Sequence, residues 1–315
     1  MNDDLPAAAV RAAAAIEPHV RRTPLELLSD PGDGNQLWAK CENLQVTGSF
    51  KVRGAINALL ESGEVARSRG VVTASTGNHG AAVAFGGYRL GIDVTVYTPE
   101  VVDPSKTAAI ERWGARLVTV PGDPVDAELT AGAFAVDNGQ PYISPYNDPA
   151  VVAGQGTVGI ELTDQLNQID TLIASVGGGG LICGTAAVLR AAHPAVRVIG
   201  ASPVNSNVMM QSVAAGRITQ VASQPTLSDG TAGGVESDAI TFPMCQRLVD
   251  EWIAIDEDSI AAEMRSFIGT HHQLIEGSAA VALAAARRLS PAGITVVILC
   301  GANVAATTLR SVLEP

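Results

Sequence analysis

Short runs of apolar, often β-branched residues alternate along the chain with longer runs whose apolar positions recur at helical spacing. Strands are predicted at residues 36–41, 70–73, 93–97, 116–120, 171–174, 196–201, 252–255 and 295–299. Helices are predicted between them, and a first helix is predicted from about Pro6 to Pro18. This alternation predicts an α/β protein with parallel sheets covered by helices on both faces.

A run of four glycines follows the predicted strand at 171–174 and precedes a predicted helix at about 181–192. Successive glycines let the backbone approach a phosphate closely and adopt angles denied to other residues. A dinucleotide motif does not fit, because its third glycine would fall on Ile182 or Cys183, and the chain has no Gly-Lys pair for a nucleotide P-loop. The run predicts a site for a phosphate that does not belong to a nucleotide.

A second turn, Ala74-Ser75-Thr76-Gly77-Asn78-His79-Gly80, lies between the predicted strand at 70–73 and a helical run at 81–90. Hydroxyl groups and the unpaired amides at a helix start together form a cradle for an anion, and the helix dipole adds attraction. The turn predicts a carboxylate or phosphate site, with an ordinary capped helix as an equal alternative.

Lys51 is one of three lysines in the chain, and it stands between a Gly-Ser turn with Phe50 and a helical run at 55–60. An amine at the buried start of a helix loses hydration and feels the positive end of the helix dipole, and both effects lower its pKa. A neutral amine is the form that attacks carbonyl carbons. Lys51 is therefore a candidate for Schiff-base chemistry, and a surface or ion-paired lysine is the alternative.

The cysteines are Cys41, Cys183, Cys245 and Cys300, which lie far apart without C-x-x-C spacing. This spacing favours reduced thiols in a cytoplasmic protein over disulfides or a zinc site. Cys300 ends an apolar run, so it is either a small core residue or a weak hydrogen-bonding partner for a ring nitrogen. Adjacent histidines point to different faces, so His271 and His272 with Glu276 are not expected to bind a metal.

Together these segments resemble the fold-type II pyridoxal-phosphate enzymes, and within them the serine/threonine dehydratase and serine racemase group. The resemblance extends from about Thr23 to Val304 and includes three further segments, at 40–45, 153–157 and 276–280. It implies a tryptophan synthase β-like fold of two three-layer domains. The large domain would comprise residues 1–51 and 147–315, and the small substrate-carboxylate domain residues 52–146, with the cofactor between them.

The resemblance implies that pyridoxal 5'-phosphate is the cofactor and that Lys51 holds it as a Schiff base and later removes the substrate Cα proton. The implied cofactor-binding residues are Phe50, Lys51, Asn78, Gly177, Gly178, Gly179, Gly180, Leu181, Glu276 and Cys300. The implied substrate-binding residues are Ser75, Thr76, Gly77, Asn78 and His79. Because a thiol cannot keep a pyridine nitrogen protonated as a carboxylate does, Cys300 favours elimination over transamination.

Two departures from the group's pattern narrow the expected activity. Ser202 and Val208 stand where many relatives carry the Glu and Asp of a cation site, so no metal is expected. Thr76 stands where racemases carry a serine acid/base, so Thr76 is kept as a catalytic candidate for a minor racemase activity. The main expectation is a lyase that eliminates the 3-hydroxyl group and the amino group of an amino acid.

The substrate is expected to be threonine or serine, and Tyr146 is expected to help shape the side-chain pocket. The segment at 225–236 is also similar to the hydroxyectoine-utilisation and phenylserine dehydratase branches, which admits bulkier 3-hydroxy amino acids. The alternatives are an amino-acid racemase and a β-replacement enzyme of the cysteine synthase type. The latter group resembles Ser-x-Lys-Asp-Arg around its lysine, whereas Val52-Arg53-Gly54 follows Lys51 here.

Composition excludes several other classes of partner. With a net charge of −12 among 315 residues, the chain lacks the basic patches that nucleic acid requires. The start at Asn2 to Asp4 is acidic and no long apolar run occurs, so neither a secretory signal nor a membrane span is expected. The end at Pro315 leaves no room for a regulatory domain, which favours a catabolic role, and the resemblance implies a homodimer.

Overall fold

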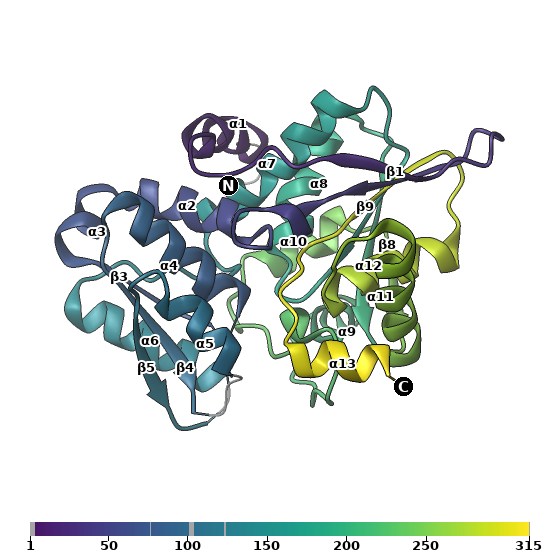
Figure 1. Ribbon diagram of the computed structural model, residues 1–315. Helices are drawn as coiled ribbons and strands as arrows, with labels where there is room; N and C mark the ends of the chain where they lie inside the picture. The colour runs from purple at the N-terminus through teal and green to yellow at the C-terminus, as the bar shows by residue number, and fades with distance from the viewer. Residues whose placement is uncertain (1–3, 76, 101–103, 123, 315) are drawn as a thin grey trace.

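The computed structural model describes residues 4–75, 77–100, 104–122 and 124–314. Its strands form two separate sheets, which lie in two lobes joined side by side (Figure 1). The strands are β1 (Leu25–Ser29), β2 (Gln36–Lys40), β3 (Val71–Ala74), β4 (Val94–Pro99), β5 (Arg116–Val120), β6 (Thr171–Ser175), β7 (Arg197–Pro203), β8 (Glu251–Ile255) and β9 (Ile294–Ile298). We call the lobe built on β3, β4 and β5 the small lobe and the rest the large lobe.

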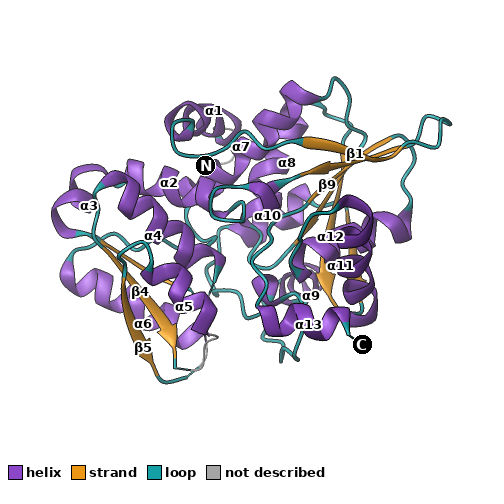
Figure 2. Ribbon diagram, in the orientation of Figure 1, coloured by secondary structure: helices purple, strands orange, loops and turns teal. Residues whose placement is uncertain are grey.

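The large lobe is built on a six-stranded sheet with the order β1-β2-β9-β6-β7-β8. All neighbours pair in parallel except β1 and β2, which pair antiparallel. Every residue of β6 is buried, as expected for a parallel strand covered on both faces. Helices surround this sheet in Figure 2, and α8 (Gly180–Ala192) and α12 (Gly277–Leu289) both contact β6.

The small lobe is built on the parallel sheet β3-β4-β5. Its helices are α2 (Lys51–Glu61), α3 (Gly63–Arg69), α4 (Asn78–Leu90), α5 (Pro104–Glu111) and α6 (Pro124–Asn138). Helix α2 contacts α4 within this lobe and α7 (Pro149–Gln165) of the large lobe. Helix α2 therefore links the two lobes immediately after Lys51.

The remaining elements belong to the large lobe. They are α1 (Leu5–Ile16), η1 (Glu42–Leu44), α9 (Val208–Ala215), η2 (Asp229–Thr231), α10 (Thr241–Leu248), α11 (Glu257–His271) and α13 (Ala306–Leu313). Among the described residues, no helix combines the length and the apolar character that crossing a membrane requires.

All eight strands predicted from the sequence are present within about two residues of their expected bounds. The sequence pattern missed β1, Leu25–Ser29, which is the antiparallel edge strand of the large sheet. This strand is only partly covered and its core-facing positions are leucines, so it lacks the β-branched run that marks the buried strands.

The topology brings the candidate motifs to one place. The glycine run follows the carboxyl end of β6, the turn at Ser75 follows β3, and Cys300 follows β9. In open parallel sheets, ligands bind outside the carboxyl ends of the strands. Three segments far apart in the sequence therefore face the same region between the lobes.

Candidate active site

A single pocket brings together residues from both lobes. Its walls are formed by Phe50, Lys51, Asn78, Pro145, Tyr146, Ser175, Gly177, Gly178, Gly179, Gly180, Leu181, Gly230, Thr231, Glu276, Ser278 and Cys300. All ten residues predicted to bind the cofactor are among them. Of the predicted substrate-binding residues, Asn78 lines the pocket.

Lys51 is the first residue of α2, and its amine lies inside the pocket. The Nζ atom donates a hydrogen bond to the Pro145 carbonyl oxygen at 3.0 Å and lies 5.4 Å from the centre of the Phe50 ring. The Phe50 amide donates to the Cys300 carbonyl at 3.0 Å, which ties the start of α2 to the end of β9. The lysine is therefore held at the junction of three segments.

Burial lowers the pKa of Lys51 to about 8, although Glu128 and Glu276 oppose the shift by favouring the ammonium form. At this pKa a useful fraction of the amine is neutral near physiological pH. Burial of the amine at the start of α2 thus favours the neutral form, which is the form that attacks carbonyl carbons.

The glycine run forms the turn between β6 and α8, and Gly179 adopts a left-handed backbone angle, φ +86°. A Cβ atom at Gly178 would lie 2.3 Å from the Tyr146 ring, and one at Gly177 would lie 3.0 Å from the Thr231 backbone. Larger residues do not fit here, so the run leaves its backbone exposed as a cradle.

The cradle fits the phosphate of pyridoxal phosphate. It ends at the start of α8, where the first amides have no carbonyl within the helix to receive them and the dipole favours an anion. Lys51 lies in the same pocket as this cradle. The pocket thus contains an amine that can react with an aldehyde and a set of backbone amides that can bind a phosphate.

The turn after β3 begins α4 at Asn78. The Ser75 hydroxyl accepts a hydrogen bond from the Gly77 amide at 3.1 Å, and the first amides of α4 are free of intrahelical partners by geometry. Thr76, a predicted catalytic and substrate-binding residue, lies outside the described residues. The turn has the arrangement of donors expected for a carboxylate.

His79 is placed differently from the other residues of this turn. Its buried ring is hydrogen-bonded through Nε2 to the Ile143 carbonyl at 3.0 Å, so this nitrogen carries the proton. Burial, assisted by the positive charge of Lys51, lowers the pKa of His79 to about 3. The imidazole is neutral and anchored to the backbone, so a ligand would meet the amide of His79 rather than its ring.

Glu276 joins the two lobes at the pocket floor. The Asn78 amide donates to both carboxylate oxygens, at 2.9 and 3.0 Å, and the Asn303 backbone amide donates to Oε2 at 3.0 Å. Asn303 also donates from its side chain to Asn78 Oδ1 at 2.7 Å. Burial raises the pKa of Glu276 to about 7, and the hydrogen bond from Asn78 opposes this rise.

Cys300 lies in the pocket wall beside the carboxyl end of β6. The Ser175 hydroxyl donates to its sulfur at 3.5 Å, and burial raises the pKa of the thiol. The thiol is therefore neutral at physiological pH. Cys300 is part of the buried core and also lines the pocket, so both alternatives left by the sequence stay open.

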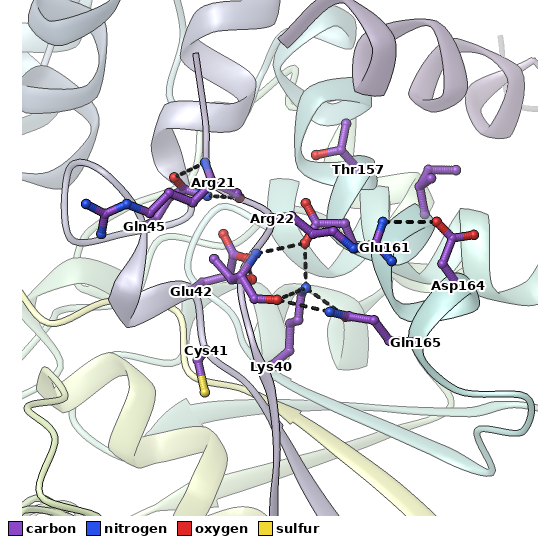
Figure 3. A network of polar contacts seen from close by, with 12 residues as sticks. Arg21, Arg22, Lys40, Cys41, Glu42, Gln45, Thr157, Glu161, Asp164 and Gln165 are labelled. Atoms are coloured by element: carbon purple, nitrogen blue, oxygen red, sulfur yellow. Dashed lines mark hydrogen bonds and ion pairs between the residues drawn. The ribbon is translucent and has the colours of Figure 1, made fainter. Parts of the chain in front are cut away.

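A buried network of opposite charges lies close to the start of α2, and most of its members are labelled in Figure 3. Lys40 donates to Glu161 at 2.5 Å, and Arg53 donates to Glu161 at 2.7 Å and to Glu42 at 2.8 Å. Lys40 and Arg53 have side chains that are 0% and 1% exposed, so their charges must be compensated locally. Two cations and two carboxylates balance, and they connect β2, η1, α2 and α7.

The four cysteines are buried and free of disulfides. Ser202, one of the two residues compared with a cation site, donates its hydroxyl to the Val176 carbonyl oxygen at 3.1 Å. The His271 ring stacks on Phe267 at 4.6 Å. Within the described ranges, no group of three potential metal ligands comes together.

The sequence pattern of the pyridoxal-phosphate dependent enzyme family matches residues 16–301. The chain belongs to this family, which confirms the predicted fold class and cofactor. It is 38% identical over 285 residues to an L-threonine ammonia-lyase of Geobacter sulfurreducens, covering 89% of this chain and 70% of that protein. It is 35% identical over 310 residues to a putative threonine dehydratase of Sinorhizobium fredii, covering 96% and 93%.

Solved structures agree with these sequence relatives. The processed form of threonine deaminase isoform 2 from Solanum lycopersicum superposes with a TM-score of 0.91 at 31% identity, covering 100% of this chain and 94% of that chain. Maize serine racemase superposes with a TM-score of 0.90 at 32% identity, covering 98% and 96%. The predicted resemblance to the dehydratase and racemase group is thereby confirmed.

Sequence reasoning did not single out Pro145, Ser175, Gly230, Thr231 and Ser278 as pocket residues or Asn303 as a partner of Asn78. Gly230 and Thr231 lie in a polar loop whose position depends on long-range packing. Asn303 lies in the glycine turn after the strand that ends at Cys300. An amide side chain in such a turn was the one local feature that could have marked it as a hydrogen-bonding residue.

Proposed function

We propose that this pyridoxal-phosphate enzyme is an ammonia-lyase that converts a 3-hydroxy amino acid to a 2-oxo acid and ammonia. Threonine and serine are the proposed substrates, and bulkier 3-hydroxy amino acids such as phenylserine are a proposed extension. Curated relatives named L-threonine ammonia-lyase and threonine dehydratase support this reaction class. Elimination releases one water, and hydrolysis of the resulting imine consumes one.

The observation that carries the proposal is the position of the Lys51 amine. It projects into a pocket that contains the glycine cradle, and its pKa is lowered to about 8 by burial. When bound there, pyridoxal phosphate withdraws electrons from the substrate Cα and makes its proton acidic. Lys51 Nζ is proposed to accept that proton, since a base with a pKa near the working pH transfers protons efficiently.

Other residues are proposed to hold the reactants. The glycine run and the start of α8 would bind the phosphate, and the first amides of α4 would bind the substrate carboxylate. Phe50 and Tyr146 line the pocket and would exclude water. The neutral Cys300 thiol cannot hold a proton on a pyridine nitrogen as an acidic residue would, which favours elimination over transamination.

The proposal is tested with purified protein reconstituted with pyridoxal phosphate. L-threonine, L-serine and L-threo-phenylserine are supplied separately, and 2-oxo acid and ammonia are measured. Equal amounts of the two products are expected, with a ranking that identifies the preferred side chain. Formation of neither product from any of the three would refute the proposed reaction.

Lys51→Ala is expected to abolish turnover, since this substitution removes both the cofactor attachment and the proton acceptor. The expected loss is at least about 1,000-fold in kcat, which combines nucleophilic and general-base contributions. The cofactor's absorbance band is measured alongside. Retained turnover with an unchanged band would remove Lys51 from the mechanism.

Racemisation is a second candidate, supported by the similarity to maize serine racemase. It requires a proton donor on the face of the substrate opposite Lys51. Chiral analysis of residual serine from the same assay separates the two activities. Accumulation of D-serine faster than 2-oxo acid would make racemisation the main reaction.

A further inference from the structure

The three lysines of this chain have distinct places. Lys40 is enclosed in the buried charge network, and Lys51 lies in the pocket. Lys106, on α5 of the small lobe, forms an ion pair with Asp229, the first residue of η2 in the large lobe. In Figure 1, α5 lies on the side of the small lobe that faces the large lobe.

The partner segment η2 is a wall of the pocket. Gly230 and Thr231, the two residues after Asp229, both line it. A Cβ atom at Gly230 would lie 2.8 Å from the Ser278 hydroxyl oxygen and 3.0 Å from Glu276 Oε1, so η2 packs directly against the pocket floor. A shift of Asp229 would therefore move Gly230 and Thr231, which are part of the pocket wall.

Among the contacts that cross between the lobes at this place, two differ in their access to water. The inner one is the hydrogen bond from the half-buried Asn78 to the buried Glu276, both of which line the pocket. The outer one is the ion pair, whose side chains are 25% exposed at Lys106 and 48% exposed at Asp229. The outer pair is therefore partly in contact with water, and it can form only when the two lobes are together.

We propose that the Lys106–Asp229 ion pair is a latch that holds the small lobe closed against η2 over the bound cofactor and substrate. This inference rests on the proposed function, because it assigns the pair to the closed state of that same site. Lys106 and Asp229 are positioning residues, and they act through Gly230 and Thr231 rather than on the reacting atoms. The latch favours the closed state before and during catalysis.

The test measures access to the bound cofactor without any substrate. Hydroxylamine removes pyridoxal phosphate from lysine, and the reaction is followed by loss of the cofactor band. Lys106→Met and Asp229→Asn are each expected to accelerate this reaction by about 2- to 5-fold, the range of a partly exposed ion pair. The two single substitutions are expected to give the same increase, because each breaks the same contact.

Charge exchange and a matched control separate the latch from a general effect on structure. Lys106→Glu combined with Asp229→Arg is expected to return the hydroxylamine rate to within about twofold of the wild-type rate, because the pair is restored. Arg287→Met breaks an ion pair with Glu263, at 2.9 Å, and is expected to leave the rate unchanged. Raising salt to about 0.5 M is expected to accelerate the wild-type reaction but not that of the single variants.

Steady-state kinetics provide a second readout. The single variants are expected to raise KM for the best substrate by about 2- to 5-fold with a smaller change in kcat, since closure is weakened before chemistry. Unchanged hydroxylamine rates in both single variants would overturn the latch. An accelerated rate that neither charge exchange nor salt affects would overturn it as well.

Failure of the latch and failure of the proposed function remain distinguishable. If the wild-type protein forms no 2-oxo acid, the proposed reaction is wrong, while the hydroxylamine rates still decide whether the pair controls access. If 2-oxo acid forms but the variants match the wild-type protein in both rate and KM, only the latch is wrong.

Discussion

The chemistry of the proposed site depends on the protonation of one amine. Burial lowers the pKa of Lys51 to about 8 from an ordinary value of 10.5, so the neutral form gains population as pH rises through 8. In the cofactor-free protein, the rate of reconstitution with pyridoxal phosphate is expected to increase about tenfold from pH 7 to pH 9 and then level off. Stopped-flow absorbance across this range measures it.

The control for this prediction is the reaction of pyridoxal phosphate with free lysine side chains in a short peptide. That rate should keep rising toward pH 10, because no burial lowers the pKa there. A protein rate that follows the peptide rate would show that Lys51 is an ordinary solvated amine.

Glu276 has its pKa shifted in the opposite direction from that of Lys51. Its pKa is raised to about 7 by burial, so the folded protein binds its proton between the ordinary value of 4.5 and about 7. The stabilisation from this neutral form is fully present below pH 4.5 and is lost as pH rises through 7. The reactivity of Lys51 therefore falls as pH drops below 8, and the stabilisation from neutral Glu276 falls as pH rises through 7.

Most of the residues singled out from local segments line one pocket, because each segment is a short strand, turn and helix. The glycine run and the turn at Ser75 could be recognised from consecutive residues, and both lie where the sheets end. The latch could not be found in this way. Lys106 and Asp229 are 123 residues apart, and nothing in either segment indicates the other.

The glycine run shows how backbone shape alone can define a binding element. Gly178→Ala would place a methyl group 2.3 Å from the Tyr146 ring. Relief of this clash would shift the cradle, so the affinity for pyridoxal phosphate is expected to fall by about 10- to 100-fold, as for an overpacked site. Titration of the cofactor-free protein by absorbance measures the change.

Gly269→Ala is the matched control, because a Cβ atom at this glycine of α11 meets nothing within 4 Å. It is expected to leave the cofactor affinity unchanged. If Gly178→Ala binds the cofactor as tightly as this control, the glycine run is not the phosphate cradle.

A buried charge network connects the two lobes in addition to the apolar core. Glu161 accepts hydrogen bonds from both Lys40 and Arg53. Burial alone would raise the pKa of Glu161, but these two cations lower it. The sequence predicted neither partner, since Lys40 on β2 and Glu161 on α7 are 121 residues apart. Such pairing is decided by three-dimensional packing, which leaves no local pattern.

Glu161→Gln is therefore expected to destabilise the whole molecule. It removes one of two buried negative charges and leaves Lys40 and Arg53 sharing Glu42, at a cost of about 3 kcal/mol in the free energy of unfolding. Asp164→Asn, one turn further along α7, makes the same chemical change in a pair with Arg22 whose side chains are 58% and 54% exposed. Its expected cost is at most about 1 kcal/mol.

Urea denaturation of both variants, with pyridoxal phosphate bound, measures the difference. The network also anchors α2 two residues beyond Lys51, so Glu161→Gln is expected to weaken cofactor retention while Asp164→Asn is not. Equal denaturation midpoints for the two variants would mean that the network contributes no more than a surface ion pair. In that case the position of Lys51 would depend instead on the contacts of Phe50 with Cys300 and of Lys51 with Pro145.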